Sequence, residues 1–467
     1  MSGNEYIEIL GDSISKGEIP PYLYCYPPRS SYRELKSPLT WDEIWEEDKK
    51  NSLTDELNLY IHVPFCRYKC GYCNLYTVVS RDQDLYDAYI DAVVKQLFRY
   101  EKVLQSRTLR TVYFGGGTPT LLSRQNFLSL FTALSTIYPN WRNSSYEVCL
   151  EATPDSIADD PDFLNFLIDN GVTRVNMGVQ SLDSSELKQA GRGNANVETI
   201  VKAFEIVNKS PLPNLSVDLI NGFAGQTDEL WKSSVDALIS FAPQTISTYF
   251  LTVRPDALFA QTGAYSYHRD PALYNRYDYA RKTILSAGYI PETNIRYKQQ
   301  GRGGYIQKCL QFHGVPYLGI GAGARTYTNT VDYLLNTDTQ PSLDKVKKYI
   351  SDIDNGIETV SVGFEYNDEE RIRKRLVLDL FDLDLQQLEP YNWESHKDLF
   401  TPILDAAEHH GLLQRVGATR LQLTPKGYKY RDNLSWLFCS PKVVDADHEF
   451  YQGLHASCVE KSKAKDN

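Results

Sequence analysis

Apolar positions along the middle of the chain follow two periodicities. Short apolar runs such as 57–63 and 111–114 predict strands, while apolar residues at helical spacing over 84–103 predict a helix. Further predicted strands are 146–150, 172–177, 215–220, 245–251 and 289–290, and further predicted helices are 123–137, 162–170, 196–208, 227–239 and 275–287. Strands that alternate with helices in this way predict a parallel α/β sheet, either barrel-like or doubly wound.

The two ends of the chain lack this alternation. Prolines and tyrosines interleave over 20–32, so this segment looks irregular. We expect an ordered N-terminal arm laid over a domain, with a flexible leader as the alternative. After residue 330 the pattern predicts a smaller, mainly helical module of winged-helix character. Its predicted helices are 342–353, 368–380, 384–388, 399–409 and 427–435, with a short strand at 420–423. We therefore expect an arm over 1–55, a barrel domain over 56–330 and a C-terminal domain over 331–467.

Composition and charge narrow the class of protein. Of 467 residues, 42% are hydrophobic and 23% are charged, which is typical of a soluble globular protein of two or three domains. The net charge of -11 disfavours binding to a nucleic-acid backbone, so the C-terminal module is expected to pack or act as a lid rather than bind DNA. No apolar stretch is long enough for a membrane span, and the acidic first residues do not resemble a secretory signal. A cytoplasmic protein is expected.

Three of the eight cysteines lie within one short segment. Cys66, Cys70 and Cys73 are close together, whereas the other cysteines stand singly. Three thiolates on a tight loop can hold three corners of an iron–sulfur cubane, and they leave the fourth iron open to chelate a small molecule. Structural zinc is the alternative, but zinc generally takes four ligands and no second cysteine pair is present.

Small and polar residues follow several of the predicted strands. The glycine run 115–117 lacks the Lys-Ser/Thr ending of a nucleotide-binding loop, so it would instead let the backbone approach a ligand; added bulk at Gly116 should then weaken ligand binding. Glu151, Gln180 and Asp218 also lie at or near strand ends, and in a barrel those ends share one face. A tight turn and satisfied polar core residues are the alternatives.

The segment 60–73, Tyr-Ile-His-Val-Pro-Phe-Cys-Arg-Tyr-Lys-Cys-Gly-Tyr-Cys, resembles the signature of radical S-adenosylmethionine (SAM) enzymes. More narrowly it resembles the oxygen-independent coproporphyrinogen III oxidase-like branch, over about residues 57–435. The resemblance implies a partial (β/α)6 barrel with a smaller helical C-terminal domain, and a [4Fe–4S] cluster on Cys66, Cys70 and Cys73. It implies one SAM, or two in methylating members. The residues implied to bind SAM are Tyr60, Tyr72, Gly116, Gly117, Thr118, Glu151, Gln180, Arg192, Asp218 and Thr252.

The resemblance also implies an activity. Members cleave SAM to a 5′-deoxyadenosyl radical and modify a porphyrin-like or natural-product substrate, with an electron donor such as flavodoxin or ferredoxin. A heme-binding chaperone with a cluster but no radical turnover is the alternative, and an internal Arg192–Asp218 ion pair is the structural alternative for those two residues. Where the oxidase carries a fourth cysteine two positions past the third, this chain has Leu75, so it is not expected to be that oxidase. Arg325 ends a late glycine-rich segment, at a position where relatives carry other residues.

Overall fold

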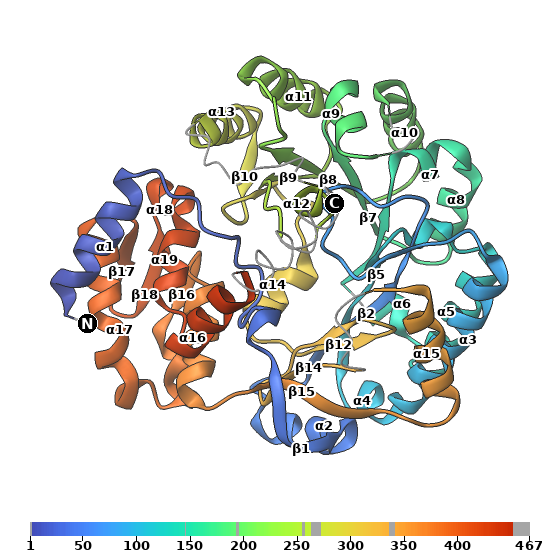
Figure 1. The fold of residues 1–467 in the computed structure, drawn as a ribbon, viewed down its shortest axis with the longest axis horizontal. Coiled ribbons are helices and arrows are strands. Elements are labelled where there is room, and N and C mark those ends of the chain that lie inside the picture. The colour runs from blue at the N-terminus through green and yellow to red at the C-terminus, as the bar shows by residue number, and fades with distance from the viewer. Residues whose placement is uncertain are drawn as a thin grey trace, which may run out of the picture.

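The fold combines a large α/β part with a smaller, mainly helical part, as Figure 1 shows. A computed structural model describes residues 2–144, 146–192, 196–254, 257–262, 272–335 and 341–451. The α/β fold with a parallel sheet, predicted from the sequence, is confirmed. Among the described helices, none has the length and apolar character needed to cross a bilayer.

A nine-stranded sheet forms the large part. Its order is β10-β11-β9-β8-β7-β6-β5-β2-β12. Six neighbours run parallel in sequence order: β2 (Glu56–Val63), β5 (Thr108–Gly116), β6 (Glu147–Ala152), β7 (Arg174–Gln180), β8 (Asn214–Asn221) and β9 (Thr245–Phe250). β12 (Tyr317–Ile320) adds in parallel to β2, while β10 (Tyr289–Pro291) and β11 (Arg296–Gln299) add antiparallel beyond β9.

The strands have one apolar and one polar face. Alternate residues such as Leu59, Ile61 and Val112 are fully buried in the main hydrophobic core with the covering helices. The residues between them, such as Tyr60 and Tyr113, pair across neighbouring strands on the opposite side. We call this second side the inner face; it carries Tyr60, Tyr113, Glu147, Cys149, Glu151, Arg174, Asn176, Gly178, Asp218, Ser247, Tyr249 and Tyr317.

The helices that cover the apolar face agree with the periodicity of the sequence. They are α3 (Gln83–Arg99), α4 (Glu101–Gln105), α5 (Arg124–Ile137), α6 (Trp141–Ser144), α7 (Pro154–Asp159), α8 (Pro161–Asp169), α9 (Ser184–Gln189), α10 (Val197–Lys209), α11 (Asp228–Ser240) and α13 (Ala272–Ser286). Side chains of Asp82, Ser123, Asn196 and Thr227 cap four of them, which fixes where each begins. The helix predicted over 84–103 is interrupted at Tyr100. Short elements complete this part: β3 (Phe65–Cys66), β4 (Val78–Val79), η2 (Pro119–Leu121), α12 (Leu258–Gln261) and α14 (Ile306–Phe312).

The N-terminal arm is ordered, and it contains more regular structure than its prolines suggested. The arm contains α1 (Gly3–Ser15), η1 (Arg29–Ser31), β1 (Arg33–Thr40) and α2 (Trp41–Asn51). Ser2 with Glu5 and Thr40 with Glu43 form capping boxes that start the two helices, and the prolines fall between these elements rather than inside them. The arm does lie over other parts of the fold: β1 pairs with β15 (Thr359–Glu365), and Leu10 and Tyr26 are buried against the C-terminal part.

The chain after residue 330 contributes to both parts. β13 (Arg325–Thr326) and β14 (Val331–Leu334) join β15 and β1 in a four-stranded sheet, so the predicted boundary at residue 330 falls within this sheet. α15 (Leu343–Asp354) buries Val346, Tyr349 and Ile353 in the main core. The helical part then comprises α16 (Asp368–Leu378), β16 (Asp382–Asp384), η3 (Leu385–Tyr391), α17 (Trp393–His409), β17 (Leu413–Val416), β18 (Arg420–Leu423), α18 (Pro425–Lys429) and α19 (Arg431–Leu437).

Candidate functional site

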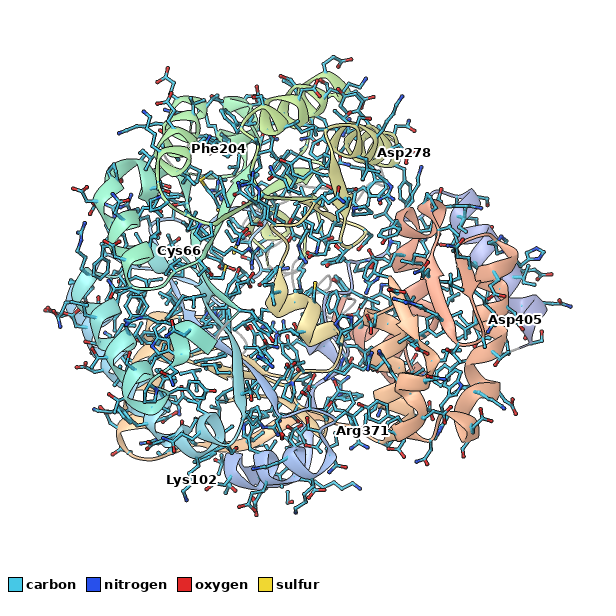
Figure 2. The ribbon with its side chains drawn as sticks, turned by 180° about the vertical axis from the view of Figure 1, so that it is seen from behind. Cys66, Lys102, Phe204, Asp278, Arg371 and Asp405 are labelled. Carbon is cyan, nitrogen blue, oxygen red and sulfur yellow. The ribbon has the colours of Figure 1, made fainter. Side chains whose placement is uncertain are left out.

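The three clustered cysteines lie on the loop that follows β2. Cys66 belongs to the short strand β3, and all three thiols are half-buried. The loop is fixed by backbone hydrogen bonds: Cys73 N donates to Cys70 O at 3.1 Å, Gly71 N donates to Ala190 O at 2.9 Å, and Phe259 N donates to Gly71 O at 2.8 Å. Cys66 lies within the large part, away from Asp405 in the helical part (Figure 2).

One cavity of about 190 Å³ collects most of the residues that the sequence singled out. Its lining includes Cys66, Cys70, Cys73, Tyr72, Gly116, Gly117, Thr118, Glu151, Gln180, Arg192 and Asp218. Tyr60 and Thr252 are not among the lining residues. The lining also includes residues that the sequence analysis missed: Arg67, Tyr68, Leu75, Thr77, Thr153, Asp155, Asn176 and Gly178. The period-two pattern of β7 could have identified Asn176 and Gly178, because they alternate with the buried Val175 and Met177.

The surroundings of the thiols suit metal-bound thiolates. Burial raises the pKa of the Cys66 thiol to about 12 and also raises that of Cys73, so both thiols are protonated in the absence of a metal. Thr118 Oγ1 donates to Cys66 Sγ at 3.7 Å, and Arg192 Nη1 donates to Cys70 Sγ at 3.9 Å. A bound metal deprotonates coordinating thiols, and these two donors would stabilise the resulting charge.

The three thiols share one cavity, which suits a cubane in which each thiolate binds a different iron. Among the residues that the structure describes, no three His, Cys, Asp or Glu side chains are placed to hold a single metal ion. Cys149 is buried in β6 and Cys309 lies on α14, away from this loop. Cys458 lies outside the described residues.

The glycines at the end of β5 lie where neighbouring residues leave no room for a side chain. Gly116 has φ +113°, and a Cβ there would lie 2.3 Å from Cε1 of His62. At Gly117 a Cβ would lie 2.4 Å from the Phe65 carbonyl oxygen. Valine at Gly116 would therefore strain the fold itself, so the change proposed from the sequence would not isolate ligand binding.

Glu151 lies at the end of β6 and is held from two sides. It accepts a hydrogen bond from Tyr113 OH at 2.8 Å and another from Gly116 N at 2.8 Å. Burial raises the pKa of its carboxyl, against the effect of these two donors. Tyr60 stacks on Tyr113 with ring centroids 5.8 Å apart, so it lies behind Glu151 rather than in the cavity.

Gln180, Arg192 and Asp218 approach the cavity from the other side. Gln180 has a left-handed φ of 74°, which is uncommon for a residue with a side chain and accompanies the shifted β7–β8 register. Arg192 Nη2 donates to Gly178 O at 2.5 Å and Nη1 donates to Tyr72 OH at 3.3 Å. Asp218 Oδ2 accepts from Asn176 Nδ2 at 2.9 Å. The alternative Arg192–Asp218 ion pair does not form.

Two polar atoms of this group are buried without a partner. Arg192 Nε and Asp218 Oδ1 make no hydrogen bond, although both residues line the cavity. Buried polar groups in folded proteins are nearly always satisfied, so these atoms indicate a polar ligand with both acceptors and donors. The amino, carboxylate and ribose groups of SAM have that chemistry, and three thiols beside them suit a cluster. The residues present therefore fit both groups.

Comparisons with known proteins agree on one family. The model of the Radical SAM superfamily matches residues 60–238. Heme chaperone HemW of Lactococcus lactis is 30% identical over 281 residues, which cover 59% of this chain and 70% of that relative. Oxygen-independent coproporphyrinogen III oxidase of Pseudomonas aeruginosa is 24% identical over 443 residues, which cover 90% of this chain and 92% of that relative.

A solved structure shares the fold. Coproporphyrinogen III oxidase from Escherichia coli superposes with a TM-score of 0.73 at 20% identity, over 89% of this chain and 96% of that one. At this identity the match concerns the fold alone.

Proposed function

Because the chain belongs to the radical SAM superfamily, alongside the heme chaperones and the oxygen-independent coproporphyrinogen III oxidases, we propose that it is an enzyme that modifies a tetrapyrrole-like or natural-product substrate. Membership implies a [4Fe–4S] cluster and SAM. We assign the cluster to Cys66, Cys70 and Cys73, and SAM to the remaining polar residues of the same cavity. When bound, and with one electron from an external donor, the cluster and SAM would supply a 5′-deoxyadenosyl radical able to abstract hydrogen from an unactivated carbon.

The side chains of the cavity have distinct proposed roles. Arg192 offers a planar guanidinium whose free Nε can bind the SAM carboxylate, and Asp218 Oδ1 can accept from a ribose hydroxyl or an amino group. Glu151 holds the backbone of the glycine loop at Gly116 N, and so positions the loop against the ligand. Lys69 Nζ donates to Thr77 Oγ1 at 2.6 Å and ties the two ends of the cysteine loop together.

One observation carries this proposal. The cysteine loop, the glycine loop, Gln180, Arg192 and Asp218 come from five separate places in the chain and line a single cavity at the carboxyl ends of parallel strands. In parallel α/β folds that edge is where ligands bind, because the loops after the strands converge there. Unpartnered polar atoms in the same cavity support a bound ligand rather than a closed core.

The alternative of a heme chaperone has its own support, since HemW relatives reach 30% identity. Anaerobic reconstitution of the cluster, followed by SAM and dithionite, separates the two functions through 5′-deoxyadenosine measured by mass spectrometry. We expect formation of 5′-deoxyadenosine that a tetrapyrrole or natural-product substrate stimulates. Stoichiometric heme binding with no 5′-deoxyadenosine at any substrate would instead establish the chaperone. Methyl transfer from a second SAM and a flavodoxin or ferredoxin donor remain predictions.

A first prediction concerns the cluster. Replacing Cys66, Cys70 or Cys73 by alanine should remove the brown chromophore and most of the bound iron, because each thiolate holds a different iron. Iron content per chain and the visible absorption spectrum measure this. Cys149→Ala is the matched control, since Cys149 is buried in β6 outside the cavity. Full iron occupancy in the triple variant would contradict the assignment.

A further inference from the structure

Tyrosines connect the cavity with a deeper region of the inner face. Tyr113, which donates to Glu151, stacks on Tyr60, and Tyr60 stacks on Tyr317 with centroids 5.5 Å apart. Tyr317 contacts Tyr327 edge-on at 5.3 Å. This aromatic series starts beside the candidate SAM residues and ends at Tyr327, directly after β13. Figure 1 shows α14 between the sheet and the helical part.

A second aromatic series leads to the same region from β9. Tyr249, two residues beyond the Ser247 that pairs with Asp218, contacts Tyr22 of the N-terminal arm at 6.2 Å. Tyr22 in turn contacts Tyr24 at 6.2 Å. Tyr24 therefore lies where the two series meet, and the arm supplies part of the wall.

Two cations flank Tyr24 at this point. Lys308 Nζ, on α14, lies 5.2 Å from the centroid of the Tyr24 ring, and Arg325 Cζ, on β13, lies 5.7 Å from it. Arg325 donates to Tyr24 OH at 2.9 Å, to Tyr327 OH at 3.4 Å and to Cys25 Sγ at 3.5 Å. Lys308 donates to Gln311 Oε1 at 2.9 Å. None of these partners is a carboxylate.

Neither cation has a carboxylate partner among the residues that the structure describes. Other cations near the inner face do have one: Arg174 lies 3.5 Å from Glu147, and Arg296 lies 3.4 Å from Glu292. The pKa of Lys308 is lowered to about 8, chiefly by burial; Cys25 acts against this lowering, and nearby Arg296 and Arg325 contribute to it. Both side chains are half-buried, and half-buried cations without a counter-charge favour an anionic ligand.

We propose that Lys308, Arg325 and Tyr24 bind an anionic group of the substrate, a carboxylate or a phosphate, and that the tyrosine series holds the substrate's planar or apolar body. The inference rests on the proposed function and deepens it by naming the chemical class of the substrate. Arg325 offers a guanidinium fork, Lys308 a point charge, and Tyr24 a hydroxyl proton, which together match the acceptors of one carboxylate or phosphate. The anion would lie at the end of the inner face remote from the cysteines.

Calorimetry on the cluster-loaded full chain tests this inference with simple probes. The probes are 3-phenylpropionate, phenyl phosphate and the neutral 3-phenylpropionamide. We expect one or both anions to bind at least about tenfold more tightly than the amide, because charge-assisted hydrogen bonds are lost with the charge. Tighter binding of phenyl phosphate would identify a phosphate site, and tighter binding of 3-phenylpropionate a carboxylate site. Equal binding of all three probes, or none by either anion, would overturn the proposal.

Variants connect the binding to the two cations. Lys308→Gln and Arg325→Gln should each weaken binding of the tighter anion by about tenfold or more. Lys102→Gln is the control of equal charge change, because Lys102 is exposed on α4 at the outer edge of the molecule (Figure 2). Anion affinity that is equal in all three variants and the wild type would contradict the inference. If a glutamine variant fails to fold, the probe comparison on the wild type still decides.

The inference and the proposed function can fail separately. Both measurements use the same wild-type preparation, with 5′-deoxyadenosine reporting the function and the probes reporting the anion site. Radical formation without a preference for anions would remove the inference alone. A preference for anions without 5′-deoxyadenosine would keep the site and favour a chaperone whose ligand carries acidic groups.

Discussion

Single residues in the cavity are positioned by partners that lie at its edge. Arg192 is buried, and its two terminal nitrogens bind Gly178 O and Tyr72 OH, which directs the rest of the guanidinium at the cavity. Asp218 is likewise held through one oxygen, by Asn176. Each side chain thus has one polar atom that is not bound within the protein and can contact a ligand.

A second prediction follows for Arg192. Arg192→Lys keeps the charge but loses the planar fork, so we expect SAM to bind the cluster-loaded protein about tenfold more weakly. Equilibrium titration with SAM measures the effect, and iron content shows whether the neighbouring Cys70 still holds its metal. Arg124→Lys is the matched control, because Arg124 pairs with Asp160 on the surface. Unchanged SAM affinity in Arg192→Lys would argue that this residue is only structural.

A third prediction concerns how the unfolding free energy depends on pH through His62. This histidine is 4% exposed, and burial lowers its pKa to about 4 from an ordinary 6.5. The unfolded chain therefore binds more protons between these values, so the stability that neutral His62 contributes is complete above pH 6.5 and is lost as the pH falls toward 4. Between about pH 7 and about pH 5 this loss amounts to about 2 kcal/mol of unfolding free energy.

Urea unfolding of the wild type and of His62→Gln at both pH values measures this loss. Burial raises the pKa of Asp332 to about 6, which acts in the opposite direction, but Asp332 is present in both proteins. The difference between their pH slopes therefore reports His62. We expect the wild type to lose more stability on acidification than the variant. Equal slopes would show that His62 titrates normally in the folded chain.

At the scale of elements, the first helix of the chain packs closely on a helix of the C-terminal part. α1 lies on α17, where His410 Nε2 is 2.8 Å from the Ile7 carbonyl oxygen. A Cβ at Gly11 would lie 2.9 Å from Cε1 of His410, so glycine permits this close approach. Leu10 is fully buried in the second hydrophobic core at the same contact. The helix is thus part of the C-terminal core.

A fourth prediction tests that contact. Leu10→Ala should lower the unfolding free energy by about 2–5 kcal/mol, because it leaves a cavity in the second core. Ile9→Ala is the matched control, since Ile9 is next in sequence and 42% exposed, and it should change the unfolding free energy by less than about 0.5 kcal/mol. Denaturant unfolding measures both. Similar effects of the two substitutions would show that α1 does not pack stably on α17.

At the scale of the whole molecule, the first part of the N-terminal arm and the helical part share one hydrophobic core. Leu10, Leu23, Tyr26 and Tyr32 share a hydrophobic core with residues of the helical part. Arg431 donates to Leu23 O at 2.7 Å, and Trp436 Nε1 donates to Pro21 O at 2.9 Å. We propose that the helical domain includes the arm up to about residue 32, whereas residues 341–360 belong with the barrel core.

A fifth prediction follows from this division. Removing residues 1–32 should make Cys439 at least about tenfold more reactive toward alkylation, because the core that buries it loses one side. Cys439 is adjacent to Ser440, whose backbone N donates to Tyr26 OH at 3.3 Å. Cys149 is an internal control, since it is buried in the barrel sheet and should stay slow. Site-by-site labelling by mass spectrometry measures both thiols. Unchanged protection of Cys439 would contradict a shared module.

Local features of this protein follow from its sequence alone. The alternation of Leu57, Leu59 and Ile61 with Asn58 and Tyr60 specifies a strand with two unlike faces, because side chains point to opposite sides at every second residue. The spacing of the three cysteines predicts a metal-binding loop, because residues that are close in sequence are also close in space. The capping boxes of the arm were also present in the sequence, and the density of prolines obscured them.

Only the tertiary structure decided how distant segments meet. The spacing of Arg192 and Asp218 does not reveal that each binds a different neighbour, and nothing near Lys308 in the sequence points to Tyr24 or Arg325. The same holds for β1 and β15, which pair across most of the chain. Such contacts depend on the total apolar area that the fold buries and on the entropic cost of closing long loops. Both quantities are properties of the whole molecule. Periodicity within one segment reports only the face that the segment will bury, not the partner that covers it.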